Sequence, residues 1–163
     1  ITFAIGAATA SGTTDTDGDA SATLTLAGPA GSSELTASFA GDASYSSAGD
    51  SSTFTVDKED TTLVLADAVG VGGKTPPLAT ATLSEADGTA LAGRTIEFFV
   101  EVKIKGVLTF VSIGTATTDA DGVASKSIPR KYVSETPRPI RATFAGDASF
   151  LSSTDDAVVY RLE

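Results

Sequence analysis

Two sequence motifs occur twice in this chain, in the same order and at nearly the same separation. Thr13–Ser21 (TTDTDGDAS) returns as Thr117–Ser125 (TTDADGVAS), 104 positions later. Phe39–Tyr45 (FAGDASY) returns as Phe144–Phe150 (FAGDASF), 105 positions later. Two matches in one order and at almost one offset indicate a tandem repeat. We therefore expect two related folding units, each built around the same pair of motifs.

A third match fixes how the two copies differ. It pairs two alternating apolar sets 95 positions apart: Ile1, Phe3 and Ile5 with Ile96, Phe98 and Val100. The second copy therefore has nine more residues between this strand and its Asp-Gly motif. We place them in Glu101–Ile113, as an added hairpin with its tip at Lys105-Gly106. The first copy has no counterpart of Thr61–Ser84, so its first two strands are missing.

Apolar and polar residues alternate with a period of two along most of the chain, and helix signals are almost absent. This pattern predicts half-buried antiparallel strands between turns rich in Gly, Asp, Pro and Ser. In the first copy, the clearest examples are Ile1–Ile5, Leu24–Leu26 and Thr53–Val56. In the second copy, the predicted strands are Thr61–Asp67, Leu78–Ser84, Arg94–Val102, Val107–Ile113 with Thr115–Thr118, Gly122–Ile128, Ile140–Phe144 and Ala157–Leu162. About seven strands in roughly a hundred residues fit an immunoglobulin-like sandwich.

The boundary between the copies is predicted at the polar joint Asp57-Lys58-Glu59-Asp60. It gives a partial repeat over 1–57 and a complete repeat with the added hairpin over 58–163. So short a joint favours a semi-rigid, end-to-end arrangement.

Three segments of the second copy carry a resemblance to a known family: Leu91–Ile96 (LAGRTI), Gly114–Ala124 (GTATTDADGVA) and Ala142–Phe150 (ATFAGDASF). Together they resemble the bacterial Ig-like repeat family. The resemblance covers 61–163, and 1–57 as a partial copy. It implies an all-β chain of tandem immunoglobulin-like β-sandwiches, the first one partial. It also implies a non-catalytic module of cell-surface or secreted proteins. The long Glu101–Ile113 segment and the truncated first copy depart from the compact family pattern.

The composition excludes most classes of catalytic site. The chain contains no His, Cys, Met or Trp, and no Asn or Gln. It therefore has no Ser-His-Asp triad, no Cys nucleophile, no disulfide and no zinc or copper site of the usual nitrogen and sulfur ligands. We expect no enzyme, no cofactor, and no catalytic or metal-binding residues. The missing side chains are prone to oxidation and deamidation, which suits a durable extracellular or thermophilic protein.

Two acidic clusters suggest calcium, and we favour a simpler interpretation of each. An EF-hand loop needs Gly at position 6 and Glu at position 12. Counted from Asp15 or Asp119, the Gly falls at position 4, and position 12 is Leu26 or Arg130. We therefore interpret both segments as hairpin turns. Asp57, Glu59 and Asp60 at the joint surround Lys58, which favours a solvated linker.

The second repeated motif ends in an aromatic residue in both copies. Tyr45 has a hydroxyl and Phe150 has none. We therefore expect a shared apolar role, in which each ring closes one end of its sandwich.

Charge is distributed unevenly along the chain. Residues 1–57 hold seven acidic residues and no Lys or Arg, while residues 58–163 hold all 11 basic residues and the other 14 acidic ones. The net charge of −10 argues against binding nucleic acid or an anionic membrane. The basic residues gather in the added hairpin and around a Pro-rich loop: Lys103, Lys105, Lys126, Arg130, Lys131, Arg138 and Arg141. This arrangement suggests head-to-tail attraction to other copies, or contact with an acidic envelope polymer.

The missing strands leave two alternatives open. The chain starts at Ile1 without a signal-peptide pattern, so we expect a processed chain or a fragment whose missing strands lie upstream. The alternative is strand donation by a neighbouring subunit, which would build a fibre.

We conclude from the sequence that the function is structural. The chain is expected to be a rigid spacer or an end-to-end assembly module of an extracellular surface protein or filament. Its partners would be other copies, other domains of the same protein, or a receptor. The alternative is an adhesive module that recognises a carbohydrate or a protein receptor through Glu101–Ile113 and the Ile128–Pro139 loop, where Tyr132 is the only aromatic residue. An enzyme that uses paired carboxylates is the third and least favoured class.

Overall fold

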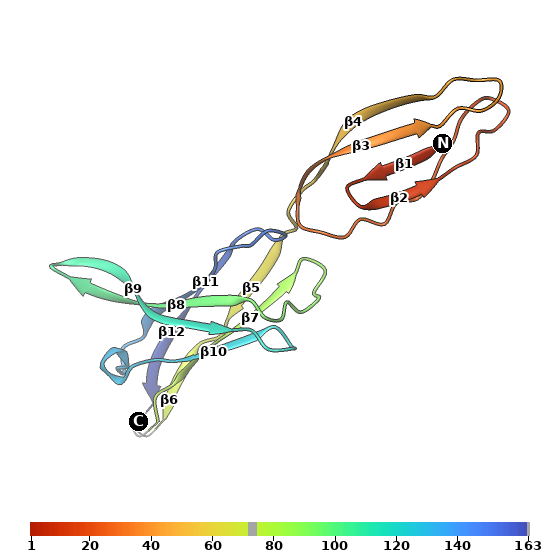
Figure 1. Ribbon diagram of the computed structural model, residues 1–163. Coiled ribbons are helices and arrows are strands. Elements are labelled where there is room, and N and C mark those ends of the chain that lie inside the picture. The colour runs from red at the N-terminus through yellow and green to blue at the C-terminus, as the bar shows by residue number, and fades with distance from the viewer. Residues whose placement is uncertain (72–74, 163) are drawn as a thin grey trace. The chain divides into compact units, whose positions relative to one another are not determined.

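The computed structural model describes residues 1–71 and 75–162, and these are almost entirely strands and turns (Figure 1). The chain divides into two compact units, Ile1–Lys58 (unit 1) and Glu59–Glu163 (unit 2). The division falls within the joint Asp57-Lys58-Glu59-Asp60, one residue after the boundary predicted between residues 57 and 58. The all-β fold class is confirmed, since the described residues hold no helix beyond one 3-10 turn, η1 (Arg130–Tyr132).

Unit 1 is one antiparallel sheet of four strands in the order β2-β1-β3-β4. Its strands are β1 (Thr2–Ile5), β2 (Ala8–Ser11), β3 (Gly31–Phe39) and β4 (Ala48–Val56). Side chains alternate between its two faces, so that Phe3, Leu35 and Phe39 share one face while hydroxyl side chains cover the other.

Unit 2 contains two sheets. The first has three strands in the order β10-β7-β5, and the second has five in the order β6-β12-β11-β8-β9. The strands are β5 (Thr61–Leu65), β6 (Ala68–Val71), β7 (Leu78–Glu85), β8 (Thr95–Ile104), β9 (Val107–Thr117), β10 (Val123–Ser127), β11 (Arg138–Phe144) and β12 (Ser153–Leu162).

The two sheets of unit 2 share one hydrophobic core, in a β-sandwich-like arrangement. The three-stranded sheet contributes Leu63, Leu65, Ala79, Ala81, Leu83 and Ala124, and the five-stranded sheet contributes Ile96, Phe98, Val100, Ile140, Ala142, Phe144 and Val159. These residues follow the alternation of their strands, because only every second side chain reaches the inner face.

The four strands of unit 1 have the order and the register of four strands of unit 2. Phe3 lies opposite Ala37 on the neighbouring strand, as Phe98 lies opposite Ala142. Phe39 lies opposite Ala48, as Phe144 lies opposite Ser153. These residues are related by the sequence offsets given above. The sheet β2-β1-β3-β4 therefore corresponds to β9-β8-β11-β12, without the three-stranded sheet that covers the latter.

The strand predicted at Leu24–Leu26 is wrong. Residues 12–30, between β2 and β3, form no strand. In unit 2, the offset of 104 places the counterpart of Leu24 at Ile128, directly after β10, and β10 is held by pairing with β7. Unit 1 contains no counterpart of β7, so this segment has no backbone partner along which to extend.

The hairpin expected in Glu101–Ile113 is present. Strands β8 and β9 stay paired out to Ile104 and Val107, and the hairpin extends past the neighbouring strands as an arm (Figure 1). Its two-residue turn places Lys105 and Gly106 at φ of 50° and 89°. Positive φ at both positions is typical of the tight turn that matches the twist of a hairpin.

Candidate functional site

The Asp-Gly motifs form turns closed by an aspartate. In unit 2, the backbone N–H groups of Asp121 and Val123 donate to Asp119 Oδ1 at 3.0 and 2.9 Å. In unit 1, those of Asp17 and Asp19 donate to Asp15 Oδ1 at 2.9 and 3.0 Å. Each of these carboxylates therefore accepts bonds from its own turn, as the turn interpretation requires.

We predict that Asp119→Ala lowers the stability of unit 2 by about 1 kcal/mol, because two backbone donors lose their acceptor. We also predict that millimolar calcium leaves the melting temperature of the wild-type chain unchanged. Urea denaturation and calorimetric titration check the two statements. Asp121→Ala is the matched control, since the Asp121 carboxylate does not accept these turn bonds. Calcium stabilisation that disappears in the Asp119 variant would contradict the turn interpretation.

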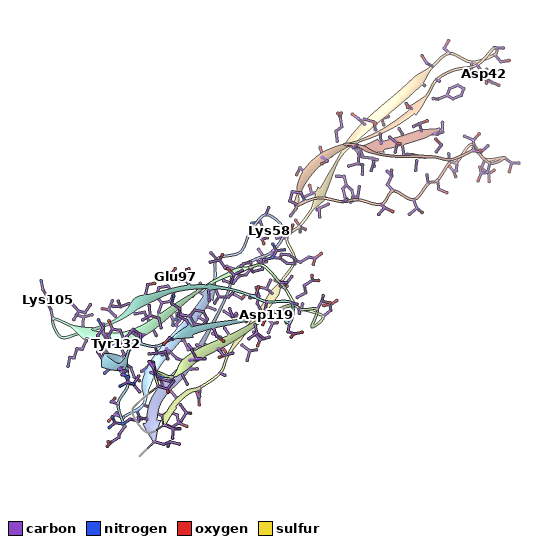
Figure 2. The ribbon with its side chains drawn as sticks, turned by 60° about the horizontal axis from the view of Figure 1, so that its bottom comes forward. Asp42, Lys58, Glu97, Lys105, Asp119 and Tyr132 are labelled. Carbon is purple, nitrogen blue, oxygen red and sulfur yellow. The ribbon has the colours of Figure 1, made fainter. Side chains whose placement is uncertain are left out.

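The second motif also forms a turn in both units. The Asp147 Oδ1 atom accepts from the N–H groups of Ser149 and Phe150 at 2.8 and 3.0 Å. The Asp42 Oδ1 atom accepts from those of Ser44 and Tyr45 at 2.7 and 2.9 Å. In Figure 2, Asp42 lies in its turn at one end of the unit 1 sheet. Both of these repeated carboxylates, Asp42 and Asp147, thus have a local structural role.

The prediction that Tyr45 and Phe150 both close one end of a sandwich is wrong for Tyr45 in unit 1. Phe150 is 8% exposed and belongs to the core, whereas Tyr45 is 71% exposed. In unit 2, Glu59, two residues before β5, covers this turn, since it bonds through its backbone to Ser149 and Leu151. Unit 1 contains no segment in that position, so its aromatic ring stays in solvent.

A buried threonine that the sequence analysis did not single out joins two of the matching motifs. Thr118 is the buried polar side chain of the described core. Its hydroxyl donates to the Leu91 carbonyl at 2.6 Å and accepts from the Arg94 N–H at 2.8 Å. This contact joins the Leu91–Ile96 segment to the Gly114–Ala124 segment. In the sequence, the position of Thr118 beside the Asp-Gly motif was the available indication of this role.

The acidic joint forms no metal centre in the part of the chain that is described. No group of three or more potential ligands is found in residues 1–71 and 75–162. Desolvation, with a contribution from the nearby Glu59 carboxylate, raises the pKa of Glu85. Glu59 therefore faces another carboxylate of unit 2.

The tip of the arm carries a group of exposed apolar side chains. Near its tip, Val107 and Leu108 are 65% and 63% exposed, and Ile104 is also exposed. Lys105 lies at the free end (Figure 2). Farther down the arm, the Arg141 guanidinium stacks on the Phe110 ring at 4.2 Å. The base of the arm is therefore held to β11, while its tip presents apolar and basic side chains to solvent.

Arg141 also makes a two-pronged ion pair with Asp156. Its Nε and Nη2 atoms donate to the two carboxylate oxygens at 2.7 Å each. These bonds lower the pKa of Asp156 below its ordinary value, against the opposing effect of partial desolvation. The stabilisation is therefore present above the unfolded pKa of about 3.9 and is lost as the pH falls through the folded pKa.

We predict that Arg141→Gln raises the pKa of Asp156 toward its ordinary value. A carboxyl-detected NMR titration measures this shift directly. The effect on stability should be small, because both side chains are substantially exposed. Arg161→Gln, which removes a separate pair with Glu135, is the matched control and should leave Asp156 unchanged. An unchanged Asp156 pKa in the Arg141 variant would contradict the assignment.

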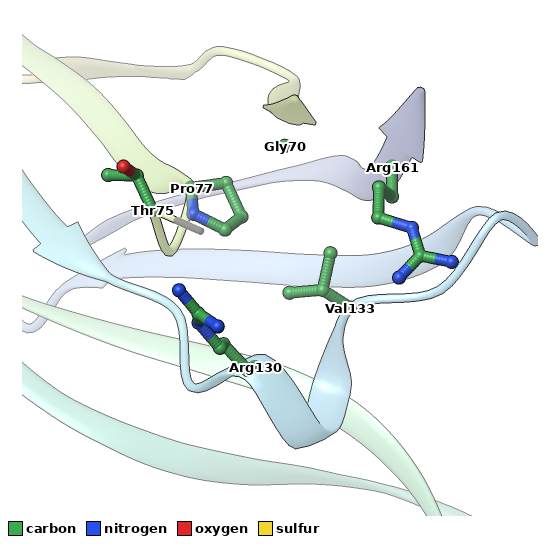
Figure 3. Close-up of a pocket in the computed structure, with 6 residues that line it drawn as sticks. All are labelled: Gly70, Thr75, Pro77, Arg130, Val133 and Arg161. Atoms are coloured by element: carbon green, nitrogen blue, oxygen red, sulfur yellow. The ribbon is translucent and has the colours of Figure 1, made fainter. Parts of the chain in front are cut away.

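Two hollows in unit 2 are candidate binding sites. The first, lined by Gly70, Thr75, Pro77, Arg130, Val133 and Arg161, has a volume of about 60 Å³ (Figure 3). This is well below the roughly 300 Å³ of typical small-molecule sites. The Arg161 guanidinium there donates to Glu135 at 3.1 Å.

The second hollow is a shallow depression of about 370 Å³ beside the Asp147 turn. Arg94 lies in it, with its Nη1 atom 3.3 Å from Asp147 Oδ2 and its guanidinium 5.2 Å from the centre of the Phe150 ring. Arg94 and Asp147 are therefore part of the turn structure, and the third charged residue of the lining, Glu97, accepts a hydrogen bond from the Ser112 hydroxyl at 2.7 Å.

Comparison of the chain with protein-family models, with curated proteins and with solved structures finds no match. Among the described residues, no helix has the length and apolar character needed to cross a membrane.

Proposed function

We propose that this chain is a non-catalytic structural module, a spacer or assembly element of an extracellular surface protein or filament, built from tandem immunoglobulin-like units. The structural roles of the repeated residues support this proposal. The matching segments rebuild the same four strands in the same register, and the repeated aspartates close turns. The recurring sequence is thus accounted for by architecture.

The observation that carries the mechanical part of the proposal is the ladder between β6 and β12. These strands are parallel, with Ala68 opposite Val159 and Val71 opposite Leu162. β6 lies near the start of unit 2 and β12 at its end. When the two ends of unit 2 are pulled apart, this ladder is loaded in shear, so that its hydrogen bonds share the force. A module that transmits tension along a surface protein needs such a contact.

Single-molecule force spectroscopy on the full chain tests the proposal. Unit 2 is expected to unfold in one step, and Val69→Pro should lower the unfolding force because proline removes a backbone donor from β6. Val107→Pro, at the tip of the arm, is the control and should leave the force unchanged. Extension of unit 2 without a defined unfolding step would contradict a load-bearing role.

A second candidate function is adhesion to a carbohydrate or protein receptor, and the exposed tip of the arm favours it. Surface binding that is lost in Val107→Ser and kept in Val64→Ser would support this alternative, since Val64 is also exposed, at 55% against 65% for Val107, but lies on β5, outside the arm. A glycan and protein array without binding would favour the spacer.

A further inference from the structure

The sheet of unit 1 has one largely apolar face, and nothing within unit 1 buries it. The register places ten apolar side chains on this side: Phe3, Ile5, Ala8, Ala10, Leu35, Ala37, Phe39, Ala48, Phe54 and Val56. Ser33, Asp50 and Ser52 lie on the same side. No residue of unit 1 is buried, and Phe54 and Val56 are each 38% exposed. An exposed face on which apolar side chains predominate in this way indicates an interaction surface.

In unit 2, a second sheet covers the face that corresponds to this one. The corresponding residues Phe98, Ile140 and Phe144 are buried beneath the sheet β10-β7-β5. The inward side chains of that cover are leucines and alanines at alternate positions of β5 and β7. Since unit 1 has the same strand register, a hairpin of the same pattern fits its face.

Three local comparisons indicate the same arrangement. A Cβ atom on Gly122 would lie 2.3 Å from the Leu83 carbonyl oxygen of β7, whereas one on Gly18 would meet nothing within 4 Å. Tyr45 is exposed where Phe150 is covered. The segment that corresponds to β10 has no strand partner. All three differences lie where β5 and β7 stand in unit 2.

We propose that the apolar face of unit 1 binds a two-stranded β-hairpin of the β5–β7 pattern. In this hairpin, apolar side chains at every second position face Phe3, Leu35 and Phe39, and one strand pairs with the segment that corresponds to β10. The inference goes beyond a spacer function, because it assigns unit 1 a surface and a partner.

The test adds such a hairpin to the full chain. A second copy of residues 59–95 is fused directly before Ile1, because Ile1 corresponds to Ile96 and the join then repeats the order found in unit 2. Hydrogen exchange is read separately for β1 and β3 and, as an internal reference, for β8 and β11. Amides of β1 and β3 should exchange about 100-fold more slowly in the fusion, while those of β8 and β11 stay unchanged.

In the control fusion, Ser replaces the leucines of the added copy that correspond to Leu63, Leu65 and Leu83. This fusion should not slow the exchange of the β1 and β3 amides. A synthetic peptide of residues 59–95, mixed with the original chain, should protect the same amides at high concentration, since the covalent link mainly raises the effective concentration. Unchanged exchange in the fusion, with unit 2 intact, would overturn the proposal. So would sedimentation showing that the original chain dimerises with β1 and β3 already protected, because a second copy would then be the occupant.

Discussion

Replacing Phe98 by alanine is expected to destabilise unit 2 by about 3–5 kcal/mol, whereas Phe3→Ala should cost far less. The two residues occupy the same position in matching sheets, opposite Ala142 and Ala37. Phe98 is fully buried, and Phe3 is only partly covered. Loss of the Phe98 ring removes apolar contacts on both sides and leaves a cavity between two sheets. Loss of the Phe3 ring leaves a shallower depression on an open face.

Urea denaturation, with exchange resolved for each unit, measures both effects. Because a domain of this size has a total stability of about 5–15 kcal/mol, Phe98→Ala can leave unit 2 close to unfolded. Phe98→Leu keeps most of the volume and is expected to show a smaller loss with a measurable transition. Equal costs for Phe98→Ala and Phe3→Ala would show that the face of unit 1 is covered as well as that of unit 2.

Local features of the fold could be predicted from the sequence because short-range chemistry determines them. The turn at Lys105-Gly106 follows from its position between two alternating runs, and the Asp119 turn follows from a carboxylate placed two and four residues before its donors. Strands β7, β8 and β11 could be predicted for a similar reason, since apolar alternation needs only a face to bury.

The errors concern residues whose structure depends on a partner elsewhere in the chain. Leu24–Leu26 alternates as a strand should, but a strand also needs a neighbour to receive its hydrogen bonds. Tyr45 has the local sequence of Phe150 and lacks the Glu59 backbone that covers it. The parallel β6 was not predicted, because four residues carry too little pattern to separate a short strand from the loop after β5. Thr118 was missed because hydroxyl side chains on a strand usually face solvent.

A second difference between the two copies is expected at their Asp-Gly turns, through Gly122→Ala and Gly18→Ala. Both glycines have positive φ, 75° and 88°, so alanine costs about 1–2 kcal/mol at either position. At Gly122, the new Cβ would also lie 2.3 Å from the Leu83 carbonyl oxygen. It would disturb the bond from the Leu83 N–H to the Gly122 carbonyl, which is 2.9 Å long. Displacing β7 in this way should bring the loss to about 3 kcal/mol or more.

Denaturation of unit 2 measures the Gly122 variant, and hydrogen exchange in β1 and β3 measures the Gly18 variant. Equal small losses would show that β7 shifts away from the turn at little cost. The fusion that adds a β5–β7 hairpin before Ile1 changes the expectation for Gly18 alone. With a strand now beside its turn, Gly18→Ala should become about as damaging as Gly122→Ala, and it should reverse the protection that the fusion gives to β1 and β3. A Gly18 variant that stays harmless in the fusion would mean that the added hairpin does not occupy the position of β7.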